Sequence, residues 1–367
     1  MSGGGTAGHI YPALTVADRL LAEGHDVAFV GTPDGLEARL VSEAGIDFHA
    51  VRSRGFDRGN PLTLLTSACV TVASVTASLA LLRRERPDVV IGFGGYVSLP
   101  VGLAAVLARV PLVLHEQNSV PGLANKVLSR WARAVGVTYE SSLGALVHPE
   151  RAVVTGNPVR SAVLEASSER GRASLGLDPD ATVVLVFGGS RGAQHLNEAM
   201  VRLAPTLVAI PSLQVVHVAG TIEAAEVARR VSAVLGEQGD RYRVVDYIDQ
   251  MGDAIAAADL VVARAGATSI AELTALGRAA ILVPYPFATD DHQTGNAHAV
   301  ATAGGARIVA DADLDGPAFD GVVMALVADG PLRAQMAQAS AALARRDATE
   351  RVVALALGAA GTRKETR

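Results

Sequence analysis

The stretch ATVVLVFGGSRGAQHLN, residues 181–197, decides the fold of this chain. It runs from an uncharged, mostly aliphatic segment through a glycine-rich turn into a segment with helical character. Glycines after a strand let backbone N–H groups approach an anion, and the N-terminus of the following helix carries a partial positive charge. The stretch therefore predicts a strand, a phosphate-binding turn and a helix, the repeating unit of a parallel α/β sheet.

A similar turn lies near the start of the chain. Residues 4–8 read GGTAG and residues 188–192 read GGSRG, but only MSG precedes the first turn. The comparison predicts that the first strand of the N-terminal domain is missing and that its central position in the sheet is empty. We expect the DNA upstream of Met1 to encode an in-frame extension of about 5 to 10 residues, the length of one strand.

Short aliphatic runs alternate with helical stretches through both halves of the chain, which predicts two doubly wound parallel sheets. The runs of the first half are residues 26–31, 48–51, 88–92, 111–116, 134–137 and 152–156, and those of the second half begin at residue 181 and end at ARIVA, residues 306–310. A chain of 367 residues suits two domains. The predicted divisions are a domain over 1–158, a domain over 159–337, a helix over 338–360 that packs back on the first domain, and a disordered tail over 361–367.

Composition excludes several classes of protein. The net charge of -5 gives no global attraction to nucleic acid. Cys69 is the only cysteine, so an intrachain disulfide and a thiolate metal cluster are both excluded. The chain shows no signal-peptide pattern, which indicates a cytoplasmic protein.

Residues 62–82 form an uncharged stretch that ends at Arg83 and Arg84. Its Ser and Thr content and its place between two predicted strands favour a crossover helix on a parallel sheet. A helix lying on a membrane surface is the alternative, since the flanking arginines suit anionic headgroups.

Polar residues follow several predicted strands, at the edge where ligands bind in open α/β sheets. The segments are GFGGYVSLP (residues 92–100), HEQNSVPGLANK (115–126), GNPVR (156–160), RAGATSIAEL (264–273) and TDDHQTGNA (289–297). The adjacent carboxylates Asp290 and Asp291 have no further spaced ligands, so they do not predict a metal site.

The first turn also fits the G-x-G-x-x-G fingerprint of NAD-binding proteins, through Gly3, Gly5 and Gly8. That fingerprint requires an acidic residue at the end of the second strand. Residues 28–32 contain none, which disfavours an NAD-dependent oxidoreductase.

Seven segments, in this order, resemble the MurG family of lipid-linked N-acetylglucosaminyltransferases of peptidoglycan synthesis. They are GGGTAGHIYPAL, GFGGYVS, HEQNSVPGLANK, GNPVR, GGSRGAQHLN, ARAGATSIAEL and DHQTGNA. The resemblance implies the GT-B fold, in which two Rossmann-like domains face a cleft. It also implies an inverting transfer of GlcNAc from UDP-GlcNAc, bound mainly by the second domain, to the 4-hydroxyl of undecaprenyl-pyrophosphoryl-MurNAc-pentapeptide (lipid I), bound by the first.

The resemblance further implies an enzyme without cofactor or metal, peripheral to the cytoplasmic face of the cell membrane, with cell-wall synthesis and division proteins as possible partners. It assigns donor binding to Thr6, Ala7, Gly8, Asn118, Arg160, Ser190, Ile248, Ala267, Thr268, Ser269, Ile270, Ala271, Glu272 and Gln293. It assigns acceptor binding to Gly94, Gly95, Tyr96 and Asn125. Because an inverting displacement needs a general base, the catalytic candidates are His9 first and Glu116 second.

Two positions depart from the family pattern. Arg191 stands where glutamine is usual, and Ala7 stands where glycine is usual, so we expect an ordinary negative φ at Ala7. Two other functions fit the sequence. One is a GT-B transferase with another lipid or natural-product acceptor, and the other is a nucleotide-sugar-binding protein without turnover because its first strand is missing.

Overall fold

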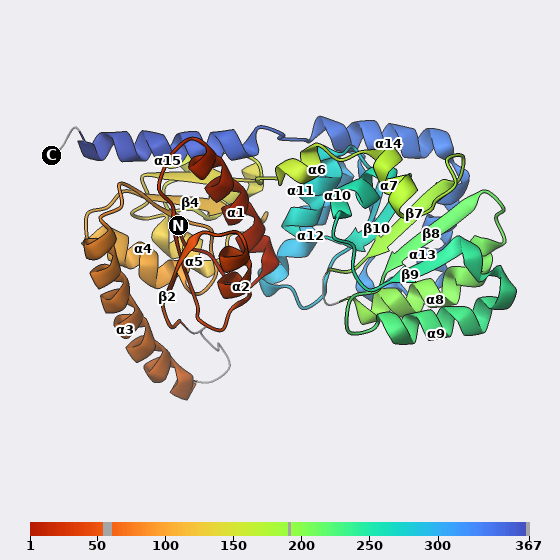
Figure 1. The fold of residues 1–367 in the computed structure, drawn as a ribbon, viewed down its shortest axis with the longest axis horizontal. Helices are drawn as coiled ribbons and strands as arrows, with labels where there is room; N and C mark the ends of the chain where they lie inside the picture. The colour runs from red at the N-terminus through yellow and green to blue at the C-terminus, as the bar shows by residue number, and fades with distance from the viewer. Residues whose placement is uncertain (54–60, 190–191, 365–367) are drawn as a thin grey trace. The chain divides into compact units, whose positions relative to one another are not determined.

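The computed structural model describes residues 1–53, 61–189 and 192–364, and it divides the chain into two compact α/β units (Figure 1). The first unit is Met1–Arg160 with Arg345–Arg367, and the second is Ser161–Ala344. The division after Arg160 lies close to the one predicted after residue 158. The predicted start of the returning helix at residue 338 falls inside a helix of the second unit, and the chain returns to the first unit at Arg345.

The strands of the first unit match the aliphatic runs of the first half, and all of their pairings are parallel. β1 pairs with β2, and β3 to β6 form a four-stranded sheet in sequence order. The strands are β1 (Ala28–Gly31), β2 (Asp47–Ala50), β3 (Val90–Gly92), β4 (Leu112–Glu116), β5 (Ala134–Val137) and β6 (Ala152–Val154). Parallel strands buried on both faces read as continuous aliphatic runs, which is why the sequence predicts them.

The first residues of the chain lie between β1 and β3. Val30 N–H donates to the carbonyl of Met1, Ser2 N–H donates to the carbonyl of Ile91, and Phe93 N–H donates to the carbonyl of Ser2, each at 2.8 Å. Ser2 therefore occupies the position between β1 and β3, where it forms a parallel bridge to each strand. The prediction that this central position is empty is wrong at Ser2. A cavity of about 110 Å³ lies beside Met1 and is lined by residues of β1, β3 and α3.

The helices of the first unit cover both faces of its sheet. They are α1 (Ala7–Ala22), α2 (Leu36–Glu43), α3 (Pro61–Glu85), α4 (Ser98–Leu107), α5 (Leu123–Leu128) and α15 (Ala348–Lys364), with short helical turns at Glu140–Ala145 and Pro149–Arg151. α15 packs on α1, β4 and β5 (Figure 1). The predicted tail begins too early, since the helix continues to Lys364.

α3 connects β2 to β3 and packs on α4, which confirms the crossover helix predicted for residues 62–82. Within the described part of the chain, no helix has the length and apolar character that a membrane span requires.

The second unit has one parallel sheet with the order β12-β11-β10-β7-β8-β9. Its strands are β7 (Thr182–Phe187), β8 (Leu213–Val218), β9 (Tyr242–Val245), β10 (Leu260–Arg264), β11 (Ala280–Val283) and β12 (Ala306–Ile308). The order reverses at β7, which makes the carboxyl end of β7 the switch point where open α/β sheets bind ligands.

The helices of the second unit are α6 (Ser161–Leu164), α7 (Ser168–Ser174), α8 (Gln194–Val208), α9 (Ala224–Leu235), α10 (Met251–Ala257), α11 (Ala267–Ala275), α12 (His292–Thr302), α13 (Pro317–Ala328) and α14 (Gly330–Ala342). Short helical turns lie at Gly236–Arg241, Thr289–Asp291 and Asp311–Asp313. In the stretch at residues 181–197, β7 and the start of α8 form as predicted. The predicted donor residue Ser190 and the unusual Arg191 lie outside the described residues.

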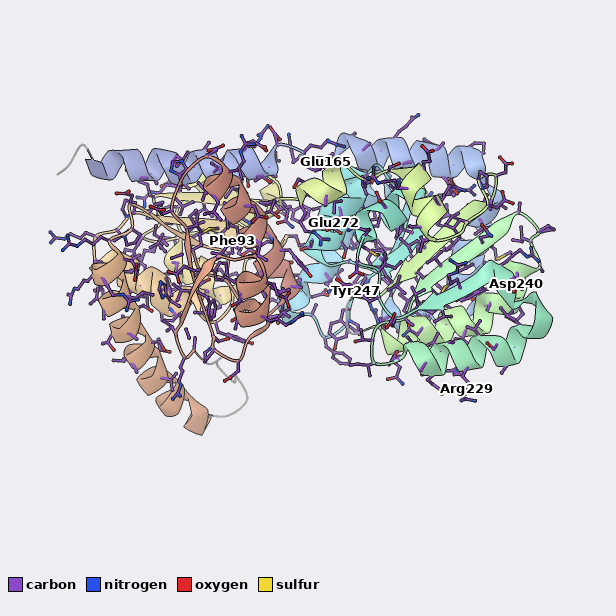
Figure 2. The ribbon with its side chains drawn as sticks, viewed as in Figure 1. Phe93, Glu165, Arg229, Asp240, Tyr247 and Glu272 are labelled. Carbon is purple, nitrogen blue, oxygen red and sulfur yellow. The ribbon has the colours of Figure 1, made fainter. Side chains whose placement is uncertain are left out.

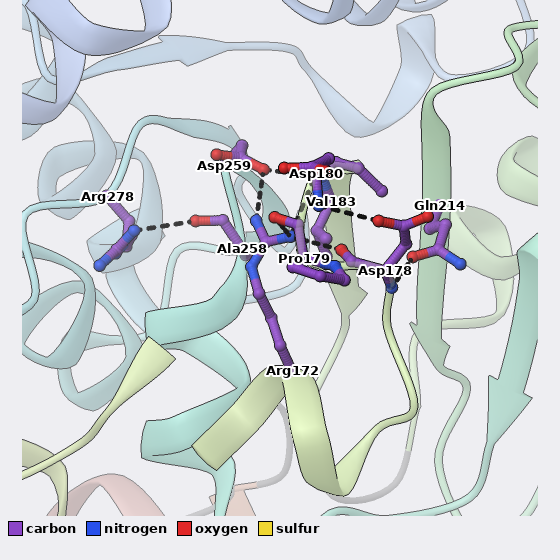
Figure 3. A network of polar contacts seen from close by, with 10 residues as sticks. Arg172, Asp178, Pro179, Asp180, Val183, Gln214, Ala258, Asp259 and Arg278 are labelled. Carbon is purple, nitrogen blue, oxygen red and sulfur yellow. Dashed lines mark hydrogen bonds and ion pairs between the residues drawn. The ribbon is translucent and has the colours of Figure 1, made fainter. Parts of the chain in front are cut away.

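The partly buried side chain of Arg172, on α7, connects the amino ends of β7 and β10 (Figure 3). Its guanidinium donates to the carbonyls of Asp178 at 2.9 Å and Ala181 at 3.0 Å, and to the Asp259 carboxylate at 3.2 Å. Asp259 also accepts the N–H of Val183 at 2.8 Å. These bonds fix the edge of the sheet opposite the glycine turn.

Candidate functional site

The first glycine turn delivers His9 on the first turn of α1. Nδ1 of His9 lies 2.9 Å from the carbonyl oxygen of Gly4 and 3.3 Å from the hydroxyl of Thr6. A carbonyl oxygen only accepts, so Nδ1 carries the hydrogen and the neutral ring has its basic lone pair on Nε2. Ala7 begins α1 without positive φ, as predicted.

The two glycines after β3 let a second turn pack against the first. Gly94 and Gly95 have φ of +92° and +81°. A Cβ added to Gly95 would overlap the carbonyl oxygen of Gly4, and one added to Gly94 would lie 3.2 Å from Nε2 of His9. The predicted acceptor residue Gly94 therefore lies against the predicted base, and Gly95 lies against Gly4, whose carbonyl contacts that base. The third, Tyr96, has 61% of its surface exposed.

Glu116, at the end of β4, closes the turn that follows it. One carboxylate oxygen accepts the N–H of Asn118 at 3.0 Å, and the other accepts the N–H of Gly122 at 3.0 Å and the side-chain amide of Asn125 at 2.8 Å. The carboxylate is buried and accepts hydrogen bonds from three residues. This geometry suits a residue that shapes the turn, and it leaves His9 as the better-placed candidate base.

A buried amide–imidazole pair connects the ends of β3, β4 and β6. Gln117 donates to the carbonyl of Phe93 at 3.0 Å and lies 3.1 Å from Nδ1 of His115. Nε2 of His115 lies 2.9 Å from the carbonyl oxygen of Gly156 and donates to it. Burial lowers the pKa of His115 to about 4, so the ring is neutral near pH 7. Phe93 lies in the interior of the first unit (Figure 2). Gln117 is therefore a buried member of this hydrogen-bond network.

Arg160 ends the Met1–Arg160 segment of the first unit, and its guanidinium stands 4.7 Å from the ring centroid of Tyr11 on α1. A guanidinium over an aromatic face gains electrostatic attraction from the ring. The predicted donor residue Arg160 is thus held by the helix that carries Thr6 to Gly8 at its start.

The N-termini of α8, α11 and α12 lie along the carboxyl edge of the second sheet, because these helices follow the parallel strands β7, β10 and β11. Each helix N-terminus favours an anion. The predicted donor residues Ala267 to Glu272 form the first turns of α11, Gln293 lies in the first turn of α12, and Ile248 lies between β9 and α10. The second sheet therefore gathers these assigned residues at one edge.

Several polar groups shape that edge. The hydroxyl of Thr268 is buried with no hydrogen-bond partner among the described residues. The side-chain oxygen of Gln293 accepts the N–H of Tyr285 at 3.0 Å, and buried Asn296 donates to the carbonyl of Ala265 at 3.3 Å. Buried Glu272 lies on α11 (Figure 2). In the described part of the chain, no group of three or more His, Cys, Asp and Glu side chains could hold a metal ion.

A charged cluster stands at the start of α8. Nδ1 of His195 lies 2.8 Å from Asp311, its Nε2 lies 3.1 Å from Asp315, and Arg264 contacts Asp311 at 2.5 Å. The hydrogen bond to Asp311 raises the pKa of His195. Burial by itself would raise the pKa of Asp311, but its bonds to His195 and Arg264 outweigh burial and lower it.

Two family models match the chain: the glycosyltransferase family 28 N-terminal domain over residues 1–137 and the glycosyltransferase family 28 C-terminal domain over residues 183–352. The crystal structure of MurG from Acinetobacter baumannii matches with a TM-score of 0.78 and 30% identity, covering 98% of each chain. A protein of Desulfitobacterium hafniense is 39% identical over 363 residues, covering 98% of each chain, and one of Burkholderia lata is 42% identical over 370 residues, covering 99% of this chain and 96% of its own. Both are named UDP-N-acetylglucosamine--N-acetylmuramyl-(pentapeptide) pyrophosphoryl-undecaprenol N-acetylglucosamine transferase. The chain belongs to the MurG family.

Membership of the MurG family confirms the resemblance and the GT-B fold. The glycine spacing of the first turn also fits an NAD-dependent oxidoreductase, but the matching family models are those of a glycosyltransferase.

Two features of this MurG-family chain are absent from the sequence predictions. Glu37 accepts the N–H of Gly5 inside the first turn, so that N–H is directed to a carboxylate of the protein and not to a bound phosphate. The only sequence signal was an acidic residue in the first turn of the helix after β1. The second is the cluster of His195 with Asp311, whose members are too far apart in sequence to be paired from it.

Proposed function

We propose that the protein transfers GlcNAc from UDP-GlcNAc to the 4-hydroxyl of MurNAc in lipid I and thereby makes lipid II. The names of the MurG-family relatives support this choice of donor and acceptor. The observation that carries the mechanism is the 2.9 Å contact between Nδ1 of His9 and the Gly4 carbonyl, because it gives the tautomer that a base requires.

In the proposed step, Nε2 of His9 accepts the proton of the acceptor hydroxyl as its oxygen attacks the anomeric carbon of GlcNAc. The bond between that carbon and the diphosphate breaks, and UDP leaves with the electron pair. A positioned general base contributes a factor of about 100 to 10,000 to such a rate. Attack from the face opposite UDP inverts the anomeric configuration.

The leaving diphosphate gains negative charge, and we assign its stabilisation to helix N-termini of the second unit and to Arg160. Helix N-termini and a guanidinium act as preorganised donors at the site of developing charge. The proposal therefore needs no metal ion at the diphosphate.

We place the protein at the cytoplasmic face of the membrane that holds its lipid acceptor. Leu123 and Val127 lie one turn apart on α5, and Trp131 lies just after the end of that helix; their exposed fractions are 46%, 40% and 44%. Lys126 and Arg130 alternate with them in sequence. Exposed apolar side chains beside basic ones suit an anionic lipid surface, and cosedimentation with anionic and neutral vesicles tests this placement.

The decisive experiment mixes the purified protein with labelled UDP-GlcNAc and a lipid I analogue. We expect a labelled disaccharide product that is absent when the acceptor is omitted. Donor binding by calorimetry without turnover would favour the nucleotide-sugar-binding protein. Transfer to a different acceptor, with none to the lipid I analogue, would favour another GT-B transferase.

A further inference from the structure

The first turn of α2 places a carboxylate inside the first glycine turn. Glu37 has an exposed fraction of 0%. Three glycines make room for it, since a Cβ added to Gly4, Gly31 or Gly35 would overlap its side chain. The chain thus leaves a carboxylate-sized space beneath the residues that lead to His9.

The carboxylate is anionic at neutral pH. It accepts the N–H of Thr32 at 3.0 Å, the hydroxyl of Thr32 at 2.6 Å and the N–H of Gly5 at 3.3 Å. Burial by itself would raise the pKa of Glu37, but the hydrogen bonds from Thr32 and Gly5 outweigh burial and lower it. Hydrogen bonds to an ionised group are also stronger than those between neutral groups.

The N–H of Gly5 and the carbonyl of Gly4 belong to one peptide group. Its N–H end donates to Glu37, and its carbonyl end accepts from Nδ1 of His9 at 2.9 Å. Hydrogen bonds in a chain polarise one another. An anion at the N–H end therefore increases the negative charge on the carbonyl oxygen, which strengthens the bond to His9 and makes Nε2 more basic.

We propose that Glu37 is a positioning residue that orients His9 and raises its basicity through the Gly4–Gly5 peptide group. This inference rests on the proposed function, because it takes His9 as the base of the transfer. No proton moves along the peptide group, and Glu37 stays ionised throughout.

The test is a double-mutant cycle of Glu37→Gln and His9→Ala in the intact protein. Glu37→Gln keeps the shape of the side chain and removes its charge. We expect it to lower kcat by about 10- to 100-fold with the KM for UDP-GlcNAc within about twofold, and to have no further effect in the His9→Ala variant. The control Glu43→Gln changes an exposed carboxylate of α2 that pairs with Arg39, and we expect wild-type kinetics.

Other outcomes separate this inference from the proposed function. If the two substitutions multiply in an active protein, Glu37 acts on stability or shape alone and the inference is overturned. If the wild-type protein makes no disaccharide, the proposed function fails before Glu37 is tested.

A measurement on the wild-type protein covers the case in which Glu37→Gln does not fold. The ¹⁵N shifts of His9 distinguish its tautomers. We expect the hydrogen on Nδ1, and a neutral ring with its hydrogen on Nε2 would overturn the proposed relay.

Discussion

The carbonyl oxygen of Gly4 accepts a hydrogen bond from Nδ1 of His9 at 2.9 Å. The glycine turn of the first unit therefore fixes the tautomer of an imidazole, while the N–H of Gly5 is directed to Glu37. The two similar turns have different surroundings, because the turn of the second unit leads to a helix N-terminus at the switch point of its sheet. We infer that one turn serves the base and the other serves the diphosphate.

Replacing the candidate base is expected to reduce turnover without abolishing donor binding. His9→Ala removes the imidazole, so kcat should fall by about 100- to 10,000-fold while calorimetric binding of UDP-GlcNAc stays within a few-fold. The matched control is His25→Ala, at an exposed histidine just past the same helix, which should keep wild-type kinetics. A His9→Ala variant with the wild-type rate would contradict the assignment of His9 as the base and would favour Glu116.

The contact between the first glycine turn and the turn after β3 requires a residue without a side chain at Gly95. Gly95→Ala adds a methyl group where the Gly4 carbonyl lies and forces alanine into a φ of +81°. We expect a kcat loss larger than tenfold and a lower melting temperature, since positive φ alone costs alanine about 1 to 2 kcal/mol. Gly144→Ala, which adds its Cβ to open space at negative φ, serves as the control in the same thermal and kinetic assays.

The free energy of unfolding should decrease as the pH falls below 6.5. Burial lowers the pKa of His115 to about 4 and of His217 to about 3, from 6.5 in each case. Between these values the unfolded chain binds protons that the folded chain does not, so each histidine contributes a loss of about 1.4 kcal/mol per pH unit. Denaturant titrations at several pH values from 7.5 to 5 should show that the free energy of unfolding changes less with pH in His217→Gln than in the wild type. An equal dependence on pH would contradict the prediction.

The pairing of His195 with Asp311 and Asp315 has the opposite effect on the pH dependence of stability, because it stabilises the folded chain at low pH. Its raised pKa means that the folded chain holds this proton more tightly than the unfolded chain does. The stabilisation is complete below pH 6.5 and is lost as the pH rises through the raised value. NMR titration of His195 should give a midpoint above 6.5, and Asp311→Asn should lower it.

Arg172 is expected to contribute more to stability than an exposed arginine. Arg172→Leu removes the guanidinium that donates to the Asp259 carboxylate and to the carbonyl groups of Asp178, Pro179 and Ala181 (Figure 3). We expect a loss of about 2 to 4 kcal/mol in denaturant unfolding. Arg229→Leu removes an exposed pair with Glu226 on α9 (Figure 2), and it should lower the free energy of unfolding much less than Arg172→Leu does.

Removal of divalent metal tests the stabilisation proposed for the leaving diphosphate. Helix N-termini and Arg160 remain in place when a chelator is added. We expect the rate of GlcNAc transfer to be unchanged in EDTA, and a loss that added Mg²⁺ or Mn²⁺ restores would contradict a metal-independent mechanism.

The sequence predicted the strands of both sheets because buried parallel strands are aliphatic along their whole length. It did not predict the boundary between two consecutive helices. The break between α14 and α15 falls in LARRD, residues 343–347, which contains neither glycine nor proline. Only tertiary contacts show that the chain changes units there.

Candidate residues were predictable where a motif is local, as with GGTAGH and its histidine. Glu37 could not be assigned in this way, because its role depends on a contact with Gly5 made across α1 and β1. NAD-binding proteins place their acidic residue at the end of the second strand. Here the carboxylate lies on the following helix and binds protein backbone.

The return of α15 to the first unit has a consequence for synthesis on the ribosome. Val352, Val353 and Ala356 of α15 are buried in the same core as Phe29 and Val113. The ribosome makes these residues only after the whole of the second unit. The second unit can therefore complete its core while the first still exposes apolar surface, so chains stalled near residue 344 would be natural clients for chaperones.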